Sequence, residues 1–240
     1  MSRLPVGVSF SGSLLMASAF VLSRCCRKFT LHIERRWHAL SAGVVVAYVF
    51  VNVMPELEEH RHTVAGSALG TLLDAEKRIY LWALAGFVAF AGLSRLRSAQ
   101  GGEPRRTAQL YFGTISGYVL YVLLIGYLLV RREDASLLSL GLYVFAIGLH
   151  LFMMDSELSE QYEDRYEPSG RLLLAGSVLV GWALGAAEAF PDPLTSRLFA
   201  FLAGGVLITA VHAEVRAEEG TRFLWFVGGA AAYATILLLV

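Results

Sequence analysis

The segment Gly148-Leu-His-Leu-Phe-Met-Met-Asp-Ser-Glu-Leu-Ser-Glu160 passes from an apolar run into a charged one. The apolar part belongs to a run of the length, about 20 residues, that crosses a bilayer as a helix. At about 100° per residue, His150, Met154 and Glu157 share one face of this helix and Asp155 lies off it. An ionisable side chain inside a membrane span is costly, so the segment predicts a functional site. The alternative is an interfacial or hydrogen-bonded histidine with a structural role.

The composition of the whole chain also indicates a membrane protein. Of its 240 residues, 56% are hydrophobic, above the roughly 45–50% of soluble domains. The 20 basic and 20 acidic residues cancel, so no excess of positive charge points to a nucleic-acid partner. The cysteines, Cys25 and Cys26, are adjacent and form no CxxC pattern, which predicts neither a disulfide framework nor a zinc ribbon.

Eight apolar runs are separated by charged or proline-containing segments, which predicts an all-α polytopic membrane protein with eight transmembrane helices. The chain is expected to form a single transmembrane domain over residues 1–240. The predicted spans are about 4–23, 39–54, 79–93, 108–130, 137–154, 172–190, 198–215 and 223–240.

The distribution of Lys and Arg predicts the orientation. Of these 20 residues, 13 lie in the segments that follow the first, third, fifth and seventh spans. Basic loops stay on the cytoplasmic side, so both termini are expected on the extracytoplasmic side. Ala17-Ser-Ala19 is compatible with signal cleavage, but the apolar run continues past it to Leu22, which favours a retained first helix. The predicted location is a cell membrane, multi-pass, of the bacterial inner membrane type.

Polar residues at the inner ends of two inward-running spans predict a metal site. Borderline cations such as zinc accept imidazole and carboxylate ligands, and a thioether suits softer ions. Charged helix ends without a ligand are the alternative. The candidate metal ligands are His150, Met154, Asp155 and Glu157 in the fifth span and His212 and Glu214 in the seventh.

A second polar group is expected at the outer ends of the second and sixth spans. Its carboxylates and imidazoles would form an outer acidic vestibule that collects cations, and a solvated loop is the alternative. The residues of this predicted outer vestibule are Asn52, Glu56, Glu59, His60, His62 and Glu188.

Small residues in the spans predict close helix packing. Gly181-Trp-Ala-Leu-Gly185 is a GxxxG sequence, and small residues let helix backbones approach closely in lipid. Packing within one chain is the favoured interpretation. A homodimer formed through such small-residue faces is the alternative, and the other expected partners are the lipid bilayer and a divalent metal ion.

The chain resembles the ZIP family of divalent metal transporters, which has an eight-span plan with both termini outside. Asn52-Val-Met-Pro-Glu56 is similar to that family's His-x-x-Pro-Glu, with Asn52 in the place of the His. His150-Leu-Phe-Met-Met-Asp155 is similar to its His-Glu-x-Pro-His-Glu, and the seventh span, Gly204 to Glu214, has its glycine-rich texture. The fourth span departs from the family, because Tyr111–Tyr118 holds no His, Asp or Asn where the family has metal ligands.

The resemblance implies a ZIP-like transporter of a divalent cation, zinc or similar, with a reduced metal site. The alternative is a transport-inactive ZIP-like protein that acts as a sensor, scaffold or assembly partner. An intramembrane metal hydrolase would need several histidine ligands and an activated water, and no HxxxH pair lies within a span. GxSxG, HExxH and Walker sequences are also absent, so we expect no enzyme and no tightly bound cofactor.

Overall fold

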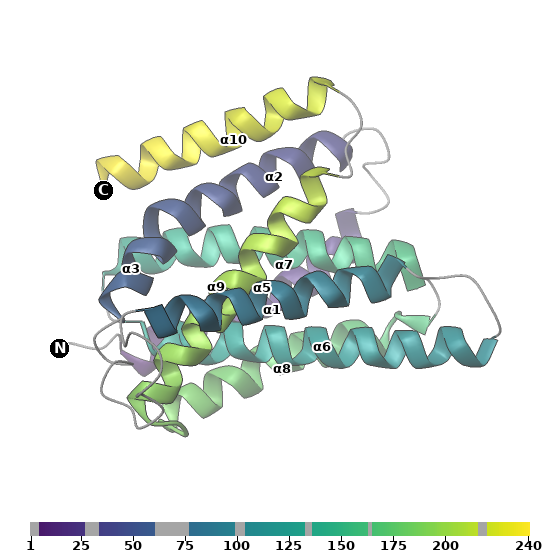
Figure 1. The fold of residues 1–240 in the computed structure, drawn as a ribbon, viewed down its shortest axis with the longest axis horizontal. Helices are drawn as coiled ribbons and strands as arrows, with labels where there is room; N and C mark the ends of the chain where they lie inside the picture. The colour runs from purple at the N-terminus through teal and green to yellow at the C-terminus, as the bar shows by residue number, and fades with distance from the viewer. Residues whose placement is uncertain are drawn as a thin grey trace. The chain divides into compact units, whose positions relative to one another are not determined.

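The computed structural model describes the backbone of residues 5–26, 34–60, 77–98, 104–132, 136–162, 165–215 and 220–240. Side chains at several helix ends, 24–26, 34–35, 96–98, 104–107, 212–215 and 220–222, lie outside the description. The described residues form helices and the turns between them, with no strand. The helices are α1 (Val6–Cys26), α2 (Glu34–Tyr48), η1 (Val49–Val53), α3 (Met54–Glu59), α5 (Arg78–Ser98), α6 (Pro104–Val130), α7 (Leu137–Tyr162), α8 (Ser169–Ala186), α9 (Asp192–Val215) and α10 (Gly220–Leu239) (Figure 1).

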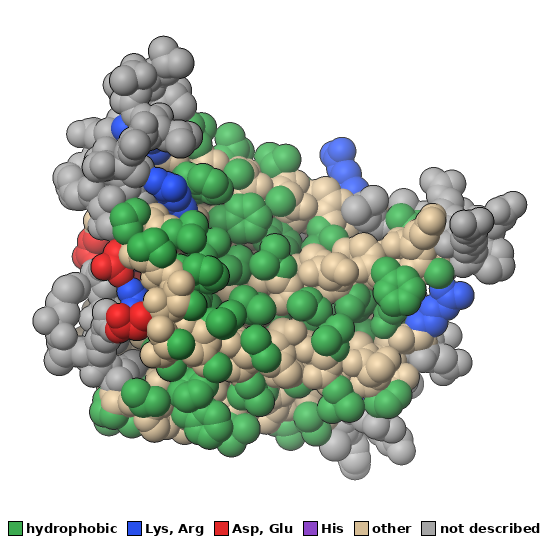
Figure 2. All heavy atoms as spheres, turned by 90° about the horizontal axis from the view of Figure 1, so that it is seen from below, with side chains coloured by type: hydrophobic (Ala, Val, Ile, Leu, Met, Phe, Trp, Pro, Cys, Tyr) green, Lys and Arg blue, Asp and Glu red, His purple; other side chains and the backbone are tan. Residues whose placement is uncertain are grey.

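The prediction of an all-α protein with membrane-type helices is confirmed. Six helical segments of the described chain are long and apolar enough to cross a bilayer: Val6–Ser23, Arg36–Glu59, Ala108–Val130, Leu137–Tyr162, Ser169–Ala186 and Asp192–Val211. In α10 the apolar part, Phe223–Leu239, is shorter, and α5 is not among the six. Hydrophobic side chains cover the middle of the face in Figure 2, and the charged side chains drawn there lie toward its margins. These are the helices of a multi-pass membrane protein.

The observed helices extend beyond several of the predicted spans. The second span does not end at Pro55, because the wider turn η1 precedes Pro55 and the helix continues to Glu59. A proline has no N–H and crowds the carbonyl four residues earlier, and a π-type turn relieves both problems. Helix α7 likewise continues past Met154 to Tyr162, since its charged end is helical too.

Two compact units make up the chain. Unit 1 comprises Met1–Glu34 and Gly92–Ala187, and unit 2 comprises Arg35–Ala91 and Glu188–Val240. Unit 1 therefore holds α1, α6, α7 and α8, with the end of α5. Unit 2 holds α2, η1, α3, most of α5, α9 and α10.

Glycines bring the helices of each unit into backbone contact. In unit 1, a Cβ atom on Gly126 of α6 would lie 2.1 Å from the carbonyl oxygen of Val178, and one on Gly181 of α8 would lie 2.0 Å from that of Leu123. The predicted GxxxG of α8 thus packs against α6 within the chain. In unit 2, Gly86 and Gly204 make the same reciprocal approach between α5 and α9, with Cβ-to-oxygen distances of 1.8 and 1.9 Å.

Glu188, just after α8, has a positive φ of 50°. This conformation ends many helices and favours glycine. Helix α8 therefore ends at Ala186, before the predicted end at 190. We expect Glu188→Gly to be more stable than Glu188→Ala by about 0.5–1 kcal/mol, since the relief of strain exceeds the added entropy of the unfolded chain. The thermal unfolding midpoint in detergent measures this.

Glu188→Ala is the control for the Glu188→Gly prediction. It removes the same carboxylate but keeps a Cβ atom in the strained conformation. A midpoint for the glycine variant no higher than that of the alanine variant would contradict the prediction.

Candidate functional site

His150 is buried within unit 1, where it contacts α6. Its side chain belongs to α7 and is 7% exposed. Its Nε2 atom lies 2.8 Å from the hydroxyl oxygen of Tyr121, a fully buried residue of α6. The two rings also meet edge to face, with centroids 5.9 Å apart. His150 is therefore a hydrogen-bonded buried imidazole.

Asp155 lies five residues further along α7 and is fully buried. It is surrounded by polar groups from other parts of unit 1, and Arg171 of α8 is the cationic one. The guanidinium Nη2 of Arg171 lies 2.9 Å from Oδ2 of Asp155, and its Nε lies 3.2 Å from Oδ1 and 3.1 Å from Oδ2. The side chain of Arg171 is 5% exposed, so this is a buried ion pair.

Two hydroxyl groups of the described residues also contact Asp155. Ser23 of α1 donates a hydrogen bond to Oδ2, and Tyr166, in the turn before α8, donates one to Oδ1. Each carboxylate oxygen thus accepts from a hydroxyl and from the guanidinium. Since a carboxylate has about four lone-pair sites, the acceptor capacity of Asp155 is used within the protein.

The Nη2 atom of Arg171, which contacts Asp155, also contacts a second carboxylate. This atom lies 3.2 Å from Oε1 of Glu167, which also accepts a hydrogen bond of 2.9 Å from Ser159. The Nη1 atom of Arg171 is buried without a partner among the described residues. We call Ser23, Asp155, Ser159, Tyr166, Glu167 and Arg171 the Asp155 cluster.

The charge of Asp155 also acts on Tyr166. Burial, and next the adjacent Asp155 carboxylate, raise the pKa of the Tyr166 hydroxyl well above its usual value. The hydroxyl therefore stays protonated at neutral pH and remains a hydrogen-bond donor to Asp155. Gly170 allows the tyrosine to fit, because a Cβ atom there would lie 2.6 Å from Cδ2 of Tyr166.

The remaining predicted metal ligands belong to α7 and α9. Met154 is buried and Glu157 is half-buried on α7. The backbones of His212 and Glu214 belong to α9, and their side chains lie outside the described residues. No group of three or more His, Cys, Asp or Glu side chains suited to a metal ion occurs among the side chains that are described.

The residues of the predicted outer vestibule that are described all belong to unit 2. His60 is 9% exposed, and its Nδ1 lies 3.1 Å from the hydroxyl oxygen of Ser196. Its ring also packs on Phe199, with a centroid distance of 5.0 Å. The other positions differ in exposure: Asn52 and Glu56 are half-buried, Glu59 and Glu188 are exposed, and His62 lies outside the described residues.

Sequence reasoning did not identify the partners of Asp155. Arg171 was expected only as one of the loop cations that set the orientation. Its position was a usable signal, since the arginine directly precedes the apolar run of α8. A charged side chain at the edge of a membrane span usually has a partner. Ser23 and Tyr166 carried no comparable signal, because single hydroxyl residues are common in membrane helices and turns.

Comparison with known proteins adds nothing to this description. The chain matches no protein-family model and no characterised protein. The ZIP resemblance therefore rests on the residues quoted above, and function has to be argued from the Asp155 cluster and His150.

Proposed function

We propose that this protein is a ZIP-like multi-pass membrane protein that does not carry metal through Asp155 and acts as a sensor, scaffold or assembly partner. The supporting observation is the buried ion pair between Asp155 and Arg171. The resemblance assigns Asp155 to the metal, and here a cationic side chain of the protein already contacts both of its oxygens. A cation would have to displace a buried guanidinium, which leaves a second charge to be compensated.

The second candidate is a transporter of zinc or a similar divalent cation. It is favoured by the burial of an imidazole and a thioether on one helix, α7, because both groups are metal ligands. His150 and Met154, both buried on α7, would be its central ligands. In this candidate Arg171 leaves Asp155 when the cation binds.

Both candidates have the same proposed orientation in the membrane. We propose eight crossings of the bacterial inner membrane with both termini on the extracytoplasmic side, as the Lys and Arg distribution favours. The Asp155 cluster then belongs to the cytoplasmic half of unit 1, and the predicted outer vestibule to the opposite side.

Metal content and zinc flux distinguish the two candidates. We expect purified wild-type protein to retain no stoichiometric zinc, and sealed vesicles that contain it to take up zinc no faster than protein-free vesicles. Elemental analysis and a zinc-sensitive dye inside the vesicles measure these quantities. An ionophore added at the end shows that the dye responds.

Variants identify the residue responsible if flux is found. Saturable uptake that is lost in His150→Ala and kept in His38→Ala would overturn the first proposal and support the transporter. His38 is a suitable control because it is a half-buried histidine of α2, in unit 2.

A further inference from the structure

Near the Asp155 cluster, three buried polar atoms of unit 1 have no hydrogen-bond partner among the described residues. They are Oγ1 of Thr114 in α6, the hydroxyl oxygen of Tyr162 in α7 and Nη1 of Arg171 in α8. The exposed fractions of these residues are 0%, 6% and 4%. Buried polar atoms in folded proteins nearly always have a partner, either in the protein or in an ordered solvent molecule. The three atoms are therefore expected to bind a polar ligand.

Contacts of Tyr111 in α6 bring the three side chains to one level of unit 1. Thr114 follows Tyr111 by about one turn of the same helix. The ring of Tyr162 packs edge to face on that of Tyr111, with centroids 5.1 Å apart. On α8, a Cβ atom on Gly170, the residue before Arg171, would lie 3.1 Å from the hydroxyl oxygen of Tyr111. The three unpartnered atoms thus belong to three helices that meet around one residue.

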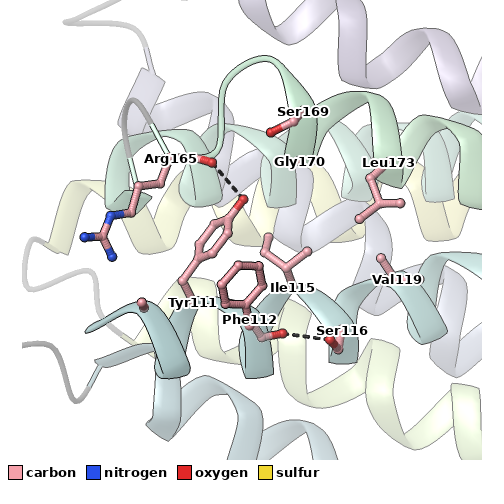
Figure 3. A pocket seen from close by; sticks show the side chains of 10 residues that line it. Tyr111, Phe112, Ile115, Ser116, Val119, Arg165, Ser169, Gly170 and Leu173 are labelled. Atoms are coloured by element: carbon pink, nitrogen blue, oxygen red, sulfur yellow. Dashed lines mark hydrogen bonds between the residues drawn. The ribbon is translucent and has the colours of Figure 1, made fainter. Parts of the chain in front are cut away.

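Tyr111 is also the boundary between this interior and an apolar groove on the surface of unit 1. The groove lies between α6 and α8, and both Tyr111 and Gly170 line it. The hydroxyl of Tyr111 is engaged on the groove side, where it donates a hydrogen bond of 2.8 Å to the carbonyl oxygen of Arg165 (Figure 3). The three residues with unpartnered atoms do not line the groove. Their ligand would therefore lie between the helices.

The ion pair with Asp155 directs Nη1 of Arg171 away from that carboxylate. Asp155 contacts Nε and Nη2, which form one edge of the planar guanidinium, so Nη1 lies on the other side. Tyr162 follows Asp155 by seven residues and shares its face of α7, and a long helical side chain extends back toward the start of its helix. The Tyr162 hydroxyl is thus directed toward the level of the ion pair.

Thr114 differs from two serines of the neighbouring turns in how its hydroxyl is used. Ser116 of α6 and Ser177 of α8 each bond at 2.7 Å to the carbonyl oxygen four residues earlier in their own helix. Among the described residues, Oγ1 of Thr114 makes no such bond. Its hydroxyl is therefore available to a ligand in the interior of unit 1.

The charges beside these atoms favour a neutral ligand. Two carboxylates, Asp155 and Glu167, contact the single guanidinium of Arg171, so an additional anion would be repelled. A cation would meet the N–H groups of Nη1, which have no acceptor capacity. A water molecule can accept from a guanidinium and pair with two hydroxyl groups, and buried waters typically make about three hydrogen bonds.

We propose that Thr114, Tyr162 and Arg171 bind one internal water molecule, which accepts a hydrogen bond from Nη1 and bridges the two hydroxyl groups. This water satisfies the remaining nitrogen of the Arg171 guanidinium and so helps to hold it on Asp155. The proposal does not depend on whether the protein moves metal.

A crystal structure of the full chain, grown in sodium bromide, tests the site directly. We expect an electron-density peak within hydrogen-bonding distance of the three atoms, without an anomalous signal at the bromine absorption edge. A peak that carries the anomalous signal would identify a halide ion, and it would overturn the proposal. A map that shows ordered waters elsewhere in the protein but no peak here would overturn it as well.

Two variants of similar shape test the same water in solution. Thr114→Val and Tyr162→Phe each remove one hydroxyl group. Because a hydrogen bond to the water is lost, we expect each variant to lower the thermal unfolding midpoint in detergent by about 2–4 °C. A hydroxyl without any partner would give the opposite sign, since its removal relieves the cost of burying an unsatisfied group. A higher midpoint in either variant would therefore contradict the proposal.

The double variant shows whether the two hydroxyl groups share one water. Its loss should be smaller than the sum of the two single losses, because the first substitution already weakens the bound water. Thr209→Val is the control, since Thr209 belongs to unit 2 and bonds at 2.8 Å to the carbonyl oxygen of Gly205 in its own helix. Its effect should add to that of Tyr162→Phe. Additive losses in both pairs would overturn the shared site, and the wild-type crystal structure decides if a variant does not fold.

Discussion

Replacing Arg171 with Met is expected to destabilise the protein by about 3–5 kcal/mol, because it leaves the buried Asp155 carboxylate without its positive partner. Asp155 is fully buried, so water does not replace the guanidinium. Glu167 loses a partner as well, but its side chain is 22% exposed and can be solvated. The free energy of unfolding in mild detergent, followed by circular dichroism, measures the loss.

A double variant distinguishes the effect of an uncompensated charge from the effect of lost side-chain packing. Asp155→Asn combined with Arg171→Met removes both charges and keeps an oxygen that accepts from Ser23 and Tyr166. Since neutral replacements of buried ion pairs are often tolerated, we expect the double variant to be more stable than Arg171→Met alone.

Arg95→Met is the surface control for the same experiment. This arginine is exposed, and we expect a change within about 0.5 kcal/mol. If the loss of stability in the double variant equalled the sum of the losses in Asp155→Asn and Arg171→Met, the two charges would not be coupled. The account of the Asp155 cluster would then be wrong.

The second large effect is expected at Gly181 of α8. A methyl group there would lie 2.0 Å from the carbonyl oxygen of Leu123 and 2.9 Å from the backbone nitrogen of Tyr127. Neither backbone group can move without separating α6 from α8. Gly181→Ala should therefore lower the free energy of unfolding by about 1–3 kcal/mol or more.

Gly176, in the same helix, provides the matched control for Gly181. A Cβ atom added to Gly176 meets nothing within 4 Å, and alanine is the better helix former by about 1 kcal/mol. The two Gly→Ala changes should thus shift the unfolding midpoint in opposite directions. Shifts of the same sign and size would show that the close approach of α6 and α8 does not limit stability.

The order and type of the helices could be predicted from the sequence, because bilayer thickness requires long apolar runs and each run is visible locally. The ends of the helices were less predictable. The continuation of the second span through Pro55 depends on the π-type turn η1, and the continuation of α7 to Tyr162 crosses a charged stretch that resembles a loop in composition. Local apolarity marks the part of a helix in lipid, but not the part beyond it.

The candidate site was only partly predictable for a different reason. The spacing within α7 correctly separated the face of His150 from the position of Asp155, since helix geometry is local. Their partners come from α6, α1, α8 and the turn before α8, and no local pattern specifies which of these side chains will meet. Asp155 therefore looked like a free carboxylate available to a metal ion, whereas in the folded chain Arg171 compensates its charge.

His150 and Asp155 illustrate the division between the two sources of information. Apolarity, length and helical period are properties of the local sequence. The sequence alone was therefore enough to predict an all-α protein with two ionisable side chains, one within its fifth apolar run and one just after it. The groups that compensate or hydrogen-bond each of these two side chains depend on how the helices pack around them. Only the packing of α1, α6, α7 and α8 brought Tyr121 to His150 and Arg171 to Asp155, because the cost of burying a charge is offset by partners that are distant in sequence and close in space.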